Sequence, residues 1–368
     1  MGTTVKTVEL QEALALGLRV GRTDGTTQVR LKGHGDTLRV SVNVVGDWYE
    51  RRLGVSGGVS TLQAVVSVRH LAAVVGALHG DTTTLDCQSL GRRLSVASGA
   101  ARFGVPVIDA DHADISVPCK ADDLCPQWDR LSSAFERVAH AVGHDETRYM
   151  LCGVSLSRDG DRLALMATDG HRLAVTRTLW PVGLVIAEDA NVIVSSDSAK
   201  LLRACAQPEG RFAFDANAVH YADESQALVM RLIDGQSPDW RSIVEGIGKG
   251  QTVTVEGALL VETTEQARAI GAGSLRVKAT VDSQSVTLTA ADLELGELVV
   301  THDAAVLGGD VESDIGLNPH YLREAVKAIG GSSVDLCLVS REEPIIVLPQ
   351  GETLASAKTL AVIMPVRI

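Results

Sequence analysis

Residues 148–177 read RYMLCGVSLSRDGDRLALMATDGHRLAVTR and contain two Asp-Gly dipeptides, at 159–160 and 169–170. Apolar residues alternate with other residues on both sides of each dipeptide. Because Asp-Gly tolerates the positive φ of a tight turn, this alternation predicts consecutive β-hairpins. The second turn continues directly into His171 and Arg172. We therefore expect the end of this aliphatic strand to form a surface rim rather than part of a core.

A helix-opening pattern recurs three times along the chain. The openings lie at Ser67, Ser196 and Asn318, where a capping residue precedes apolar positions with helical spacing. Each predicted helix ends near a glycine, at position 80, 210 or 330, and a short β-like run follows it. The openings are about 120 to 130 residues apart, which predicts three repeated domains of that size.

A second helix is predicted earlier in each repeat. These helices are expected over residues 10–18, 131–142 and 259–270. The fold class is therefore α+β, with three domains that each contain two helices and antiparallel sheets. The predicted domains are residues 1–118, 119–247 and 248–368, with 108–114 as the first linker.

Composition restricts the class of protein. The chain has 368 residues and a net charge of −12, and aromatic residues make up only 3% of it, so we expect aliphatic cores. The six cysteines form no CxxC pair, a pattern typical of free thiols in a reducing cytosol. No apolar run approaches the length of a membrane span and the N-terminus lacks a signal-peptide core. We expect a soluble cytoplasmic protein with no membrane partner, no metal and no cofactor.

Four separated motifs resemble those of one known family. They are RYMLCGV at 148–154, ATDGHRLAV at 167–175, SPDW at 237–240 and VIMPVRI at 362–368. In this order they resemble the bacterial DNA sliding clamp, the beta subunit of the DNA polymerase III holoenzyme. The resemblance implies a non-catalytic processivity factor: two chains close head to tail into a ring around duplex DNA, with helices lining the hole. It also implies that short linear peptides tether the replicative polymerase, the clamp loader and repair proteins to the ring.

The resemblance implies a pocket for these partner peptides. Its residues would be Leu151, Thr168, Gly170, His171, Arg172, Leu173, Pro238, Ile243, Val362, Met364, Pro365, Val366 and Arg367. An apolar C-terminal tail would fray unless it docked, and a flexible Met suits several different peptides. For each residue taken alone, core packing is the alternative, above all for Leu173 and Ile243. Ser237 and Ser242 stand where the family usually has an aromatic residue and an arginine, so peptide specificity is expected to differ.

Positive charge on the predicted lining helices fits the same interpretation. Each of the three later helices carries about one net positive charge in a chain of −12. The predicted DNA-facing residues are Arg22, Arg69, Arg137, Tyr149, Lys200, Arg203, Arg323 and Lys327. Weak, non-specific phosphate contacts suit sliding, and a ring needs no high affinity because its retention is topological. The alternative is that these are ordinary solvated helix faces.

A dimer interface is implied by the run ARFGV at 101–105. It resembles the edge strand of the first domain, which pairs with the third domain of the other subunit. Phe103 and Val105 would lie there, and Ile270 is near the matching apolar position. Phe103 could instead be a core residue.

Other classes of function are disfavoured. The cluster Asp109, Asp111, His112 and Asp114 fits a solvated linker better than a metal site, because no further ligand follows at a known spacing. Cys152 lies in an alternating strand, which argues against a Cys/His nucleophile pair with His171. Few aromatics and an acidic balance disfavour a single-strand binder. A divergent second clamp with altered partner specificity, or a non-catalytic DNA-binding scaffold, remains the alternative.

Overall fold

The chain forms two compact units, and each is described by itself. Unit 1 comprises Met1–Asp129, Pro181–Ile186 and Lys200–Leu232, and unit 2 comprises Arg130–Trp180, Ala187–Ala199 and Ile233–Ile368. The structure is a computed structural model. It describes residues 2–20, 26–44, 46–57, 60–87, 93–108, 124–186, 192–205, 207, 209–248, 250–280, 284–308 and 314–367.

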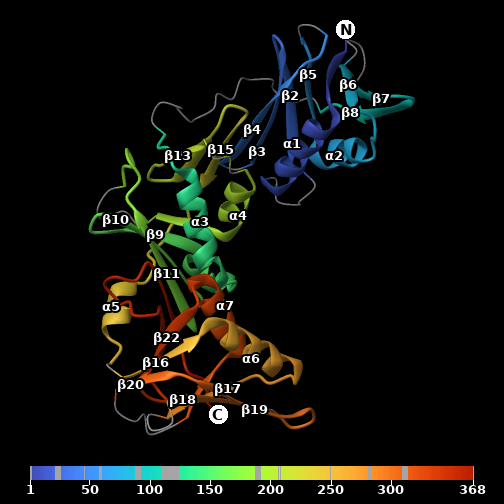
Figure 1. The fold of residues 1–368 in the computed structure, drawn as a ribbon. Coiled ribbons are helices and arrows are strands. Elements are labelled where there is room, and N and C mark those ends of the chain that lie inside the picture. Colours follow the sequence, from blue (N-terminus) through green and yellow to red (C-terminus); the bar gives the residue numbers. More distant parts are fainter. Residues whose placement is uncertain are drawn as a thin grey trace. The chain divides into compact units, whose positions relative to one another are not determined.

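Unit 1 is built from two antiparallel sheets and two helices that pack against each other (Figure 1). Its first part contains β1 (Thr3–Lys6), α1 (Thr7–Val20), β2 (Gln28–His34), β3 (Thr37–Val44), β4 (Asp47–Gly54), β5 (Gln63–Ser67), α2 (Val68–Gly76), β6 (Thr82–Cys87), β7 (Arg93–Ser98) and β8 (Ala101–Pro106). Its second part contains β13 (Arg211–Phe214), β14 (Ala218–Ala222) and β15 (Gln226–Arg231). The strand orders are β1-β6-β7-β8 and β13-β14-β15-β4-β3-β2-β5.

Part of the unit 1 core is aromatic. The Trp128 ring meets Phe212 edge-on at a centroid distance of 5.8 Å and Tyr221 at 5.2 Å. All three side chains are fully buried. The cores are therefore not wholly aliphatic, because these three aromatic residues pack together in unit 1.

Unit 2 contains the longest sheet of the molecule, with nine strands in the order β12-β9-β10-β11-β24-β23-β22-β16-β20, and a four-stranded sheet in the order β19-β18-β17-β21. Its first elements are α3 (Trp128–Val138, which begins in unit 1), the 3-10 helices η2 (Ala139–Ala141) and η3 (Glu146–Leu151), β9 (Gly153–Asp159), β10 (Arg162–Thr168), β11 (Arg172–Leu179), β12 (Val192–Ser195) and α4 (Ser196–Cys205, which ends in unit 1). The later elements are α5 (Trp240–Glu245), β16 (Gln251–Glu256), α6 (Gly257–Ala269), β17 (Leu275–Thr280), β18 (Ser285–Asp292), β19 (Gly296–Asp303), β20 (Ala305–Leu307), β21 (Ile315–Leu317), α7 (Pro319–Ile329), β22 (Ser333–Leu338), β23 (Ile345–Pro349) and β24 (Thr359–Ile363).

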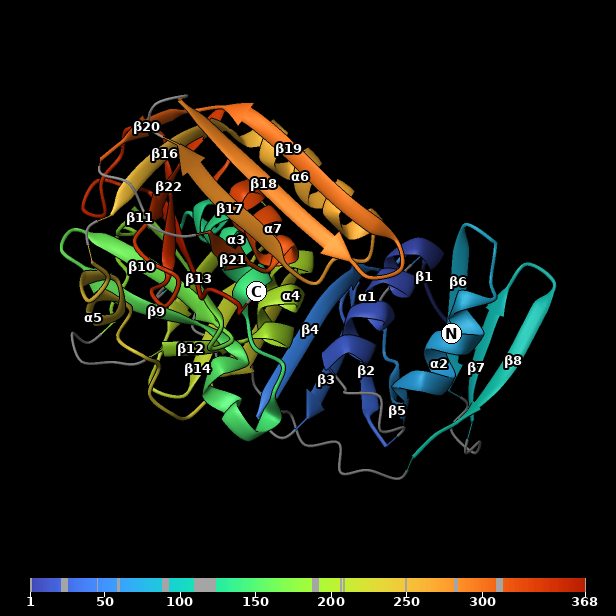
Figure 2. The same cartoon turned by 90° about the horizontal axis from the view of Figure 1, so that it is seen from below.

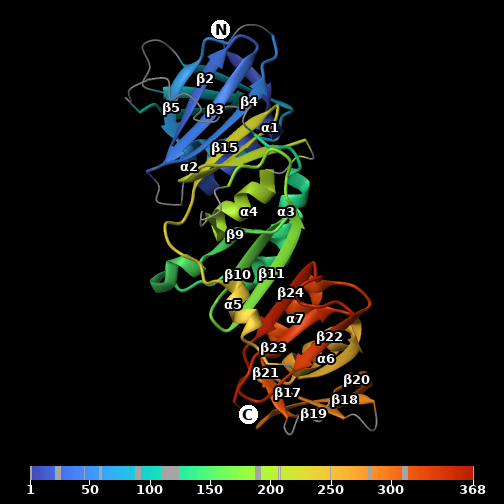
Figure 3. The same cartoon turned by 90° about the vertical axis from the view of Figure 1, so that its left-hand side faces the viewer.

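The two predicted hairpins are confirmed. β9 pairs with β10 and β10 pairs with β11, with turns at Gly160 (φ +62°) and Gly170 (φ +89°). β11 also pairs antiparallel with β24, so the C-terminal strand lies beside the second hairpin (Figure 3). This pairing brings two of the sequence motifs together.

Two of the three helix openings are capped by the residue that the sequence indicated, whereas at α4 the hydroxyl of Ser195, rather than that of Ser196, accepts the N–H of Ser198. Ser67 caps α2 by accepting the backbone N–H of His70, and Asn318 caps α7 by accepting those of His320 and Tyr321. α7 ends at Gly330 (φ +70°) as expected, whereas α2 already ends at Gly76. In unit 2, α6 and α7 lie side by side, and α6 packs against β18 and β19 (Figure 2). These helices fit the predicted repeat, and the three domain boundaries stay a prediction.

Two properties of the described residues bear on the sequence expectations. None of their helices is long and apolar enough to cross a membrane. Within the same residues no group of three or more His, Cys, Asp or Glu could hold a metal ion. The linker cluster Asp109, Asp111, His112 and Asp114 lies outside the residues that the structure describes.

Candidate functional site

The C-terminal tail and the second hairpin together form the centre of the site. Leu173 on β11 faces Val362 on β24 in the strand register. Just beyond the paired strands, the backbone N–H of Met364 donates to the carbonyl oxygen of His171 at 2.9 Å. We call the surface at this junction, formed by residues 168–173 and 362–367, the tail groove. The structure thus brings together two sets of residues that the sequence predicted for one pocket.

The turn at the rim of the groove is fixed by its own side chains. Asp169 Oδ1 accepts the backbone N–H groups of His171 and Arg172 at 2.9 and 3.0 Å. Thr168 Oγ1 donates to the carbonyl oxygen of Arg172 at 2.6 Å and accepts the N–H of Gly170. A Cβ at Gly170 would lie 2.8 Å from Arg148 Nη1, in addition to the positive φ there. The Thr-Asp-Gly sequence therefore specifies a rigid turn that presents His171 at its tip.

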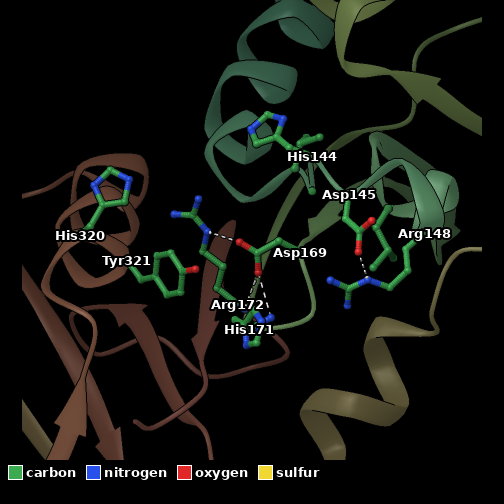
Figure 4. A pocket seen from close by; sticks show the side chains of 11 residues that line it. His144, Asp145, Arg148, Asp169, His171, Arg172, His320 and Tyr321 are labelled. Atoms are coloured by element: carbon green, nitrogen blue, oxygen red, sulfur yellow. Dashed lines mark hydrogen bonds and ion pairs between the residues drawn. The ribbon is translucent and has the colours of Figure 1, made fainter. Parts of the chain in front are cut away.

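A cavity of about 400 Å³ opens next to this turn (Figure 4). Its lining is Val142, Gly143, His144, Asp145, Arg148, Leu151, Asp169, His171, Arg172, His320 and Tyr321. Leu151, His171 and Arg172 were predicted from the sequence. Histidines, carboxylates and guanidiniums make most of the surface, so the cavity suits polar parts of a ligand.

Sequence reasoning missed eight lining residues of the cavity. They are Val142, Gly143, His144, Asp145, Arg148, Asp169, His320 and Tyr321. Four of them lie within or beside motifs that were already singled out, so proximity in sequence could have indicated them. His320 and Tyr321 open α7, and no local pattern connects this helix start with the turn after β10.

Arg172 joins the turn to α7. Its Nε lies 3.0 Å from Asp169 Oδ2, its Nη1 donates to Glu324 Oε2, and its guanidinium carbon lies 4.3 Å from the centre of the Tyr321 ring. The Arg172 side chain is only 11% exposed. Figure 4 shows Asp169 beside this guanidinium and Tyr321 on its other side. Arg172 therefore mainly supports the groove wall, and little of its side chain is open to a ligand.

The other ion pair of the cavity lies on η3. Arg148 Nε is 3.2 Å from Asp145 Oδ2. Hydrogen bonds from the side chain and backbone of Thr147 lower the pKa of Asp145. This carboxylate therefore keeps its negative charge at the cavity edge over the physiological pH range.

Helix α5 supplies the predicted second wall. Trp240 and Val244 are buried in a cluster that also contains Leu173 and Val362. Ile243, in contrast, is 39% exposed, and Pro238 is half-buried. The short helix thus packs on the residues beneath the groove and leaves Ile243 at the surface.

Both serines that depart from the family pattern have local partners. Ser237 Oγ lies 2.7 Å from Ser155 Oγ. Ser242 Oγ donates to Asp239 Oδ2 at 2.5 Å, and this bond is the main cause of the lowered pKa of Asp239. Each serine thus places a small hydroxyl side chain with a local partner on this wall.

The predicted pocket residues separate into a buried floor and an exposed edge. Leu173 and Val362 are each 3% exposed and Thr168 is 8% exposed, so their side chains belong to the floor. Met364 is 40% exposed and His171 is also exposed. The remaining tail residues are Pro365 and Val366, which are half-buried, and Arg367, which is exposed. Val366 is tied down because its N–H donates to the carbonyl oxygen of Gly316 at 2.8 Å.

The predicted DNA-facing residues are differently placed. Arg22 lies outside the described residues, while Arg69 and Tyr149 are exposed on α2 and η3. Lys200 and Arg203 lie on α4 and both have interaction partners. These residues stay predictions for DNA contact.

The cations predicted on α3 and α7 make contacts within unit 2. Arg137 Nη1 donates to the carbonyl oxygen of Ala328 at 2.9 Å. Lys327 Nζ lies 3.3 Å from Glu265 on α6, and Arg323 bonds His320 Nδ1 at 3.0 Å. Of these partners only the Glu265 carboxylate offsets a positive charge, and Arg137 and Arg323 keep their full charge.

The predicted interface residues do not share one environment. Phe103 is 39% exposed on β8, which ends its sheet. Val105, two residues further along β8, is only 2% exposed and packs in the core of unit 1, so its interface role stays a prediction. Ile270 is half-buried against the core of unit 2. Of the three side chains, Phe103 is the one presented to solvent.

Cys152 has the features of an inert thiol. Its Sγ donates to the carbonyl oxygen of Asp145 at 3.4 Å, and burial raises its pKa. A thiol that stays protonated is a poor nucleophile. The Cys152–His171 alternative therefore gains no support.

Comparison with known proteins agrees with this geometry. The family model described as the DNA polymerase III beta subunit, central domain, matches residues 127–239, and the model of its C-terminal domain matches residues 248–367. A beta sliding clamp of Rickettsia bellii is 25% identical over 365 residues, which cover 92% of this chain and 91% of the relative. One of Caulobacter vibrioides is 27% identical over 273 residues, 70% of each chain. Crystal structures of sliding clamps from Caulobacter crescentus (TM-score 0.83, 22% identity, 100% of both chains) and Bacillus subtilis (0.84, 19%, 100% and 99%) share the fold.

The fold, the hairpin motif and the docked tail together define a DNA sliding clamp, which is a non-catalytic class of protein. Within that class, the chain belongs to the family of bacterial DNA polymerase III beta subunits. As such it is a processivity factor, as the sequence motifs predicted. The family match sets aside a scaffold outside this family, and altered partner specificity stays a prediction.

Proposed function

We propose that two copies of this chain close into a ring around duplex DNA, and that each copy tethers the replicative polymerase and the clamp loader by binding their short linear peptides in the tail groove. The observation that carries the proposal is the docking of the C-terminal tail on the second hairpin, through the Met364–His171 hydrogen bond and the Leu173–Val362 pair. This junction leaves exposed apolar atoms of Met364 over a buried floor. A flexible thioether on such a floor can adapt to several peptides.

The polar cavity and the exposed apolar side chains would bind different parts of a peptide. Apolar peptide residues would pack against Met364 and Ile243, which are each about two-fifths exposed. Polar peptide residues would lie near His171 and Arg148 in the adjoining cavity. A generic clamp-binding peptide, with Gln followed two or three residues later by Leu and an aromatic residue, offers both kinds of contact.

Charge and edge strands support closure by a second copy. β8 and β19 are each the last strand of their sheet, and such edges readily pair with another chain. β8 presents Arg102 and Phe103 to solvent, whereas β19 presents Glu297 and Val299. Opposite charges and apolar side chains would thus meet if the two edges paired.

Binding to DNA would be topological rather than adhesive. A chain of net charge −12 repels phosphate overall, so ordinary electrostatic affinity is a weak means of retention. A closed ring is held on the DNA whatever its affinity. Retention at high salt therefore distinguishes a closed clamp from a protein that binds DNA by charge and is released by salt.

The ring is tested with a circular duplex. The clamp is loaded by a clamp loader with ATP onto closed circular DNA and then passed through a sizing column at high salt. We expect it to remain on circular DNA and to be lost after the DNA is linearised. Loss from both forms at high salt would contradict the ring.

The groove is tested by fluorescence anisotropy with a labelled peptide of the generic kind. We expect binding to the full chain and none after removal of residues 365–368. A peptide with its Gln and Leu replaced by Ala is the control for non-specific binding. Equal affinity of the full and truncated chains would count against the groove.

A further inference from the structure

We propose that Glu324 is a positioning residue for the tail groove, because it fixes Arg172 and through it the His171 rim. The inference rests on the proposed function, in which the groove binds peptides. Glu324 lies on α7, one turn after His320, and none of the clamp motifs contains it. Its carboxylate reaches the turn after β10 from a different part of the chain.

The contacts of Glu324 converge on one oxygen. Glu324 Oε2 accepts a hydrogen bond from Arg172 Nη1 and lies 3.1 Å from His320 Nε2. The Glu324 side chain is 27% exposed and that of Arg172 is 11% exposed. A charge pair with this degree of burial is screened less by water than a surface pair, so its geometry is held more firmly.

Arg172 passes this restraint to the rim. Its Nε pairs with Asp169 Oδ2, and Asp169 also accepts the backbone N–H groups of His171 and Arg172. The carbonyl oxygen of His171 in turn accepts the N–H of Met364. A shift of the Arg172 guanidinium therefore moves the turn, the histidine and the docked tail together.

The other side of Glu324 borders a second cavity of about 550 Å³, with Arg137, His140 and Lys327 among its walls. In Glu324→Gln a neutral amide takes the place of the carboxylate that accepts the hydrogen bond from Arg172 Nη1. We expect the guanidinium to turn toward Asp169 alone and the rim to loosen.

Peptide affinity of four proteins tests the inference. Wild type, Glu324→Gln, Arg172→Gln and the double variant are titrated against the labelled peptide, and dissociation rates are measured alongside. We expect Glu324→Gln to weaken binding about five- to tenfold, mainly through faster dissociation. In the Arg172→Gln background the same change should have no further effect, since Glu324 acts through Arg172.

Glu265→Gln is the matched control. Glu265 on α6 pairs with Lys327, which lies on α7 like Glu324, but the side chains of Glu265 and Lys327 are both about half exposed. This variant removes an acid from the contacts of α7 without touching the groove, so its peptide affinity should equal that of wild type. Glu324→Asp keeps the charge on a shorter side chain and should recover part of the affinity.

Three results would overturn the proposal. They are unchanged affinity of Glu324→Gln, an equal loss for Glu265→Gln, and a full additional loss in the Arg172→Gln background. If wild type itself bound no peptide, the proposed function would fail instead. The rate of hydrogen exchange at the backbone amides of His171 and Arg172 would then test the role of Glu324. We expect Glu324→Gln to increase this rate and Glu265→Gln to leave it unchanged. Equal exchange in Glu324→Gln and Glu265→Gln would overturn the positioning role.

Discussion

Met364 donates its backbone N–H to the carbonyl oxygen of His171, and this bond fixes an exposed methionine side chain at the end of a buried strand. Met364 is 40% exposed, whereas Val362, two residues earlier on β24, is 3% exposed. Two tail residues of similar apolar character are therefore expected to have different roles. Val362 packs in the core, and we expect Met364 to contact a peptide.

Alanine substitutions should separate these tasks. Met364→Ala should weaken peptide binding about tenfold and change the free energy of unfolding by less than about 0.5 kcal/mol. Val362→Ala removes buried methyl groups and should lower the free energy of unfolding by about 1 to 2 kcal/mol. Anisotropy and urea denaturation of both variants provide the comparison. A stability loss from Met364→Ala as large as that from Val362→Ala would show that both residues are core.

Phe103 provides a test of the dimer. Its side chain is 39% exposed on the edge strand β8. Phe103→Asp should place a charge in the pairing edge and shift the chain from dimer to monomer, because burying an unpaired carboxylate costs several kcal/mol. Light scattering at several concentrations measures the mass. Leu307→Asp is the matched control: Leu307 is 66% exposed on the edge strand β20, and its substitution should leave the dimer intact.

The hairpins and helix starts could be predicted from the sequence because their signals are local. An Asp-Gly turn between alternating strands, or Asn318 before an apolar helix, needs no information from elsewhere in the chain. The direct resemblance then indicated that the tail lies near the turn. In contrast, the Arg172–Glu324 pair joins residues with no sequence signal between them, and it became visible only in three dimensions.

Burial of single residues was the least predictable feature of the site. Val105 and Phe103 lie two positions apart in one strand, yet only Phe103 is presented to solvent. The regular pairing of β7 with β8 places both residues on the same face, so alternation alone does not separate them. Packing inside the unit determines which residue of an edge strand is covered. Composition and motifs do not predict that packing.

Asp159 is expected to be the most sensitive acid of unit 2. Its two oxygens lie 2.9 Å from Arg177 Nε and from Arg241 Nη2, and the Arg177 side chain is only 7% exposed. Both guanidiniums lie over the Trp240 ring. Asp159→Asn would leave a buried cation without its counter-charge and should lower the free energy of unfolding by about 3 kcal/mol.

Arg241→Ala is the comparison for this prediction. The Arg241 side chain is one-third exposed, so the loss of its ion pair should cost about 1 kcal/mol or less. Urea denaturation at one protein concentration measures both variants. Equal losses of unfolding free energy in the two variants would mean that the burial of Arg177 does not determine how strongly Asp159→Asn destabilises the chain.

His140 should make stability depend on pH in a defined window. Burial, followed by the nearby positive charge of Arg172, lowers the pKa of His140 to about 4. Because an unfolded histidine titrates near 6.5, the folded state binds fewer protons between these values. The stabilising effect of a neutral His140 is therefore complete above about pH 6.5 and is lost progressively as the pH falls toward 4, by up to about 3 kcal/mol. His140→Gln, which is neutral at every pH, should show a smaller drop between pH 7 and pH 4.5. Urea midpoints of wild type and variant over that range measure the difference. Parallel curves would show that folding does not lower the pKa of His140.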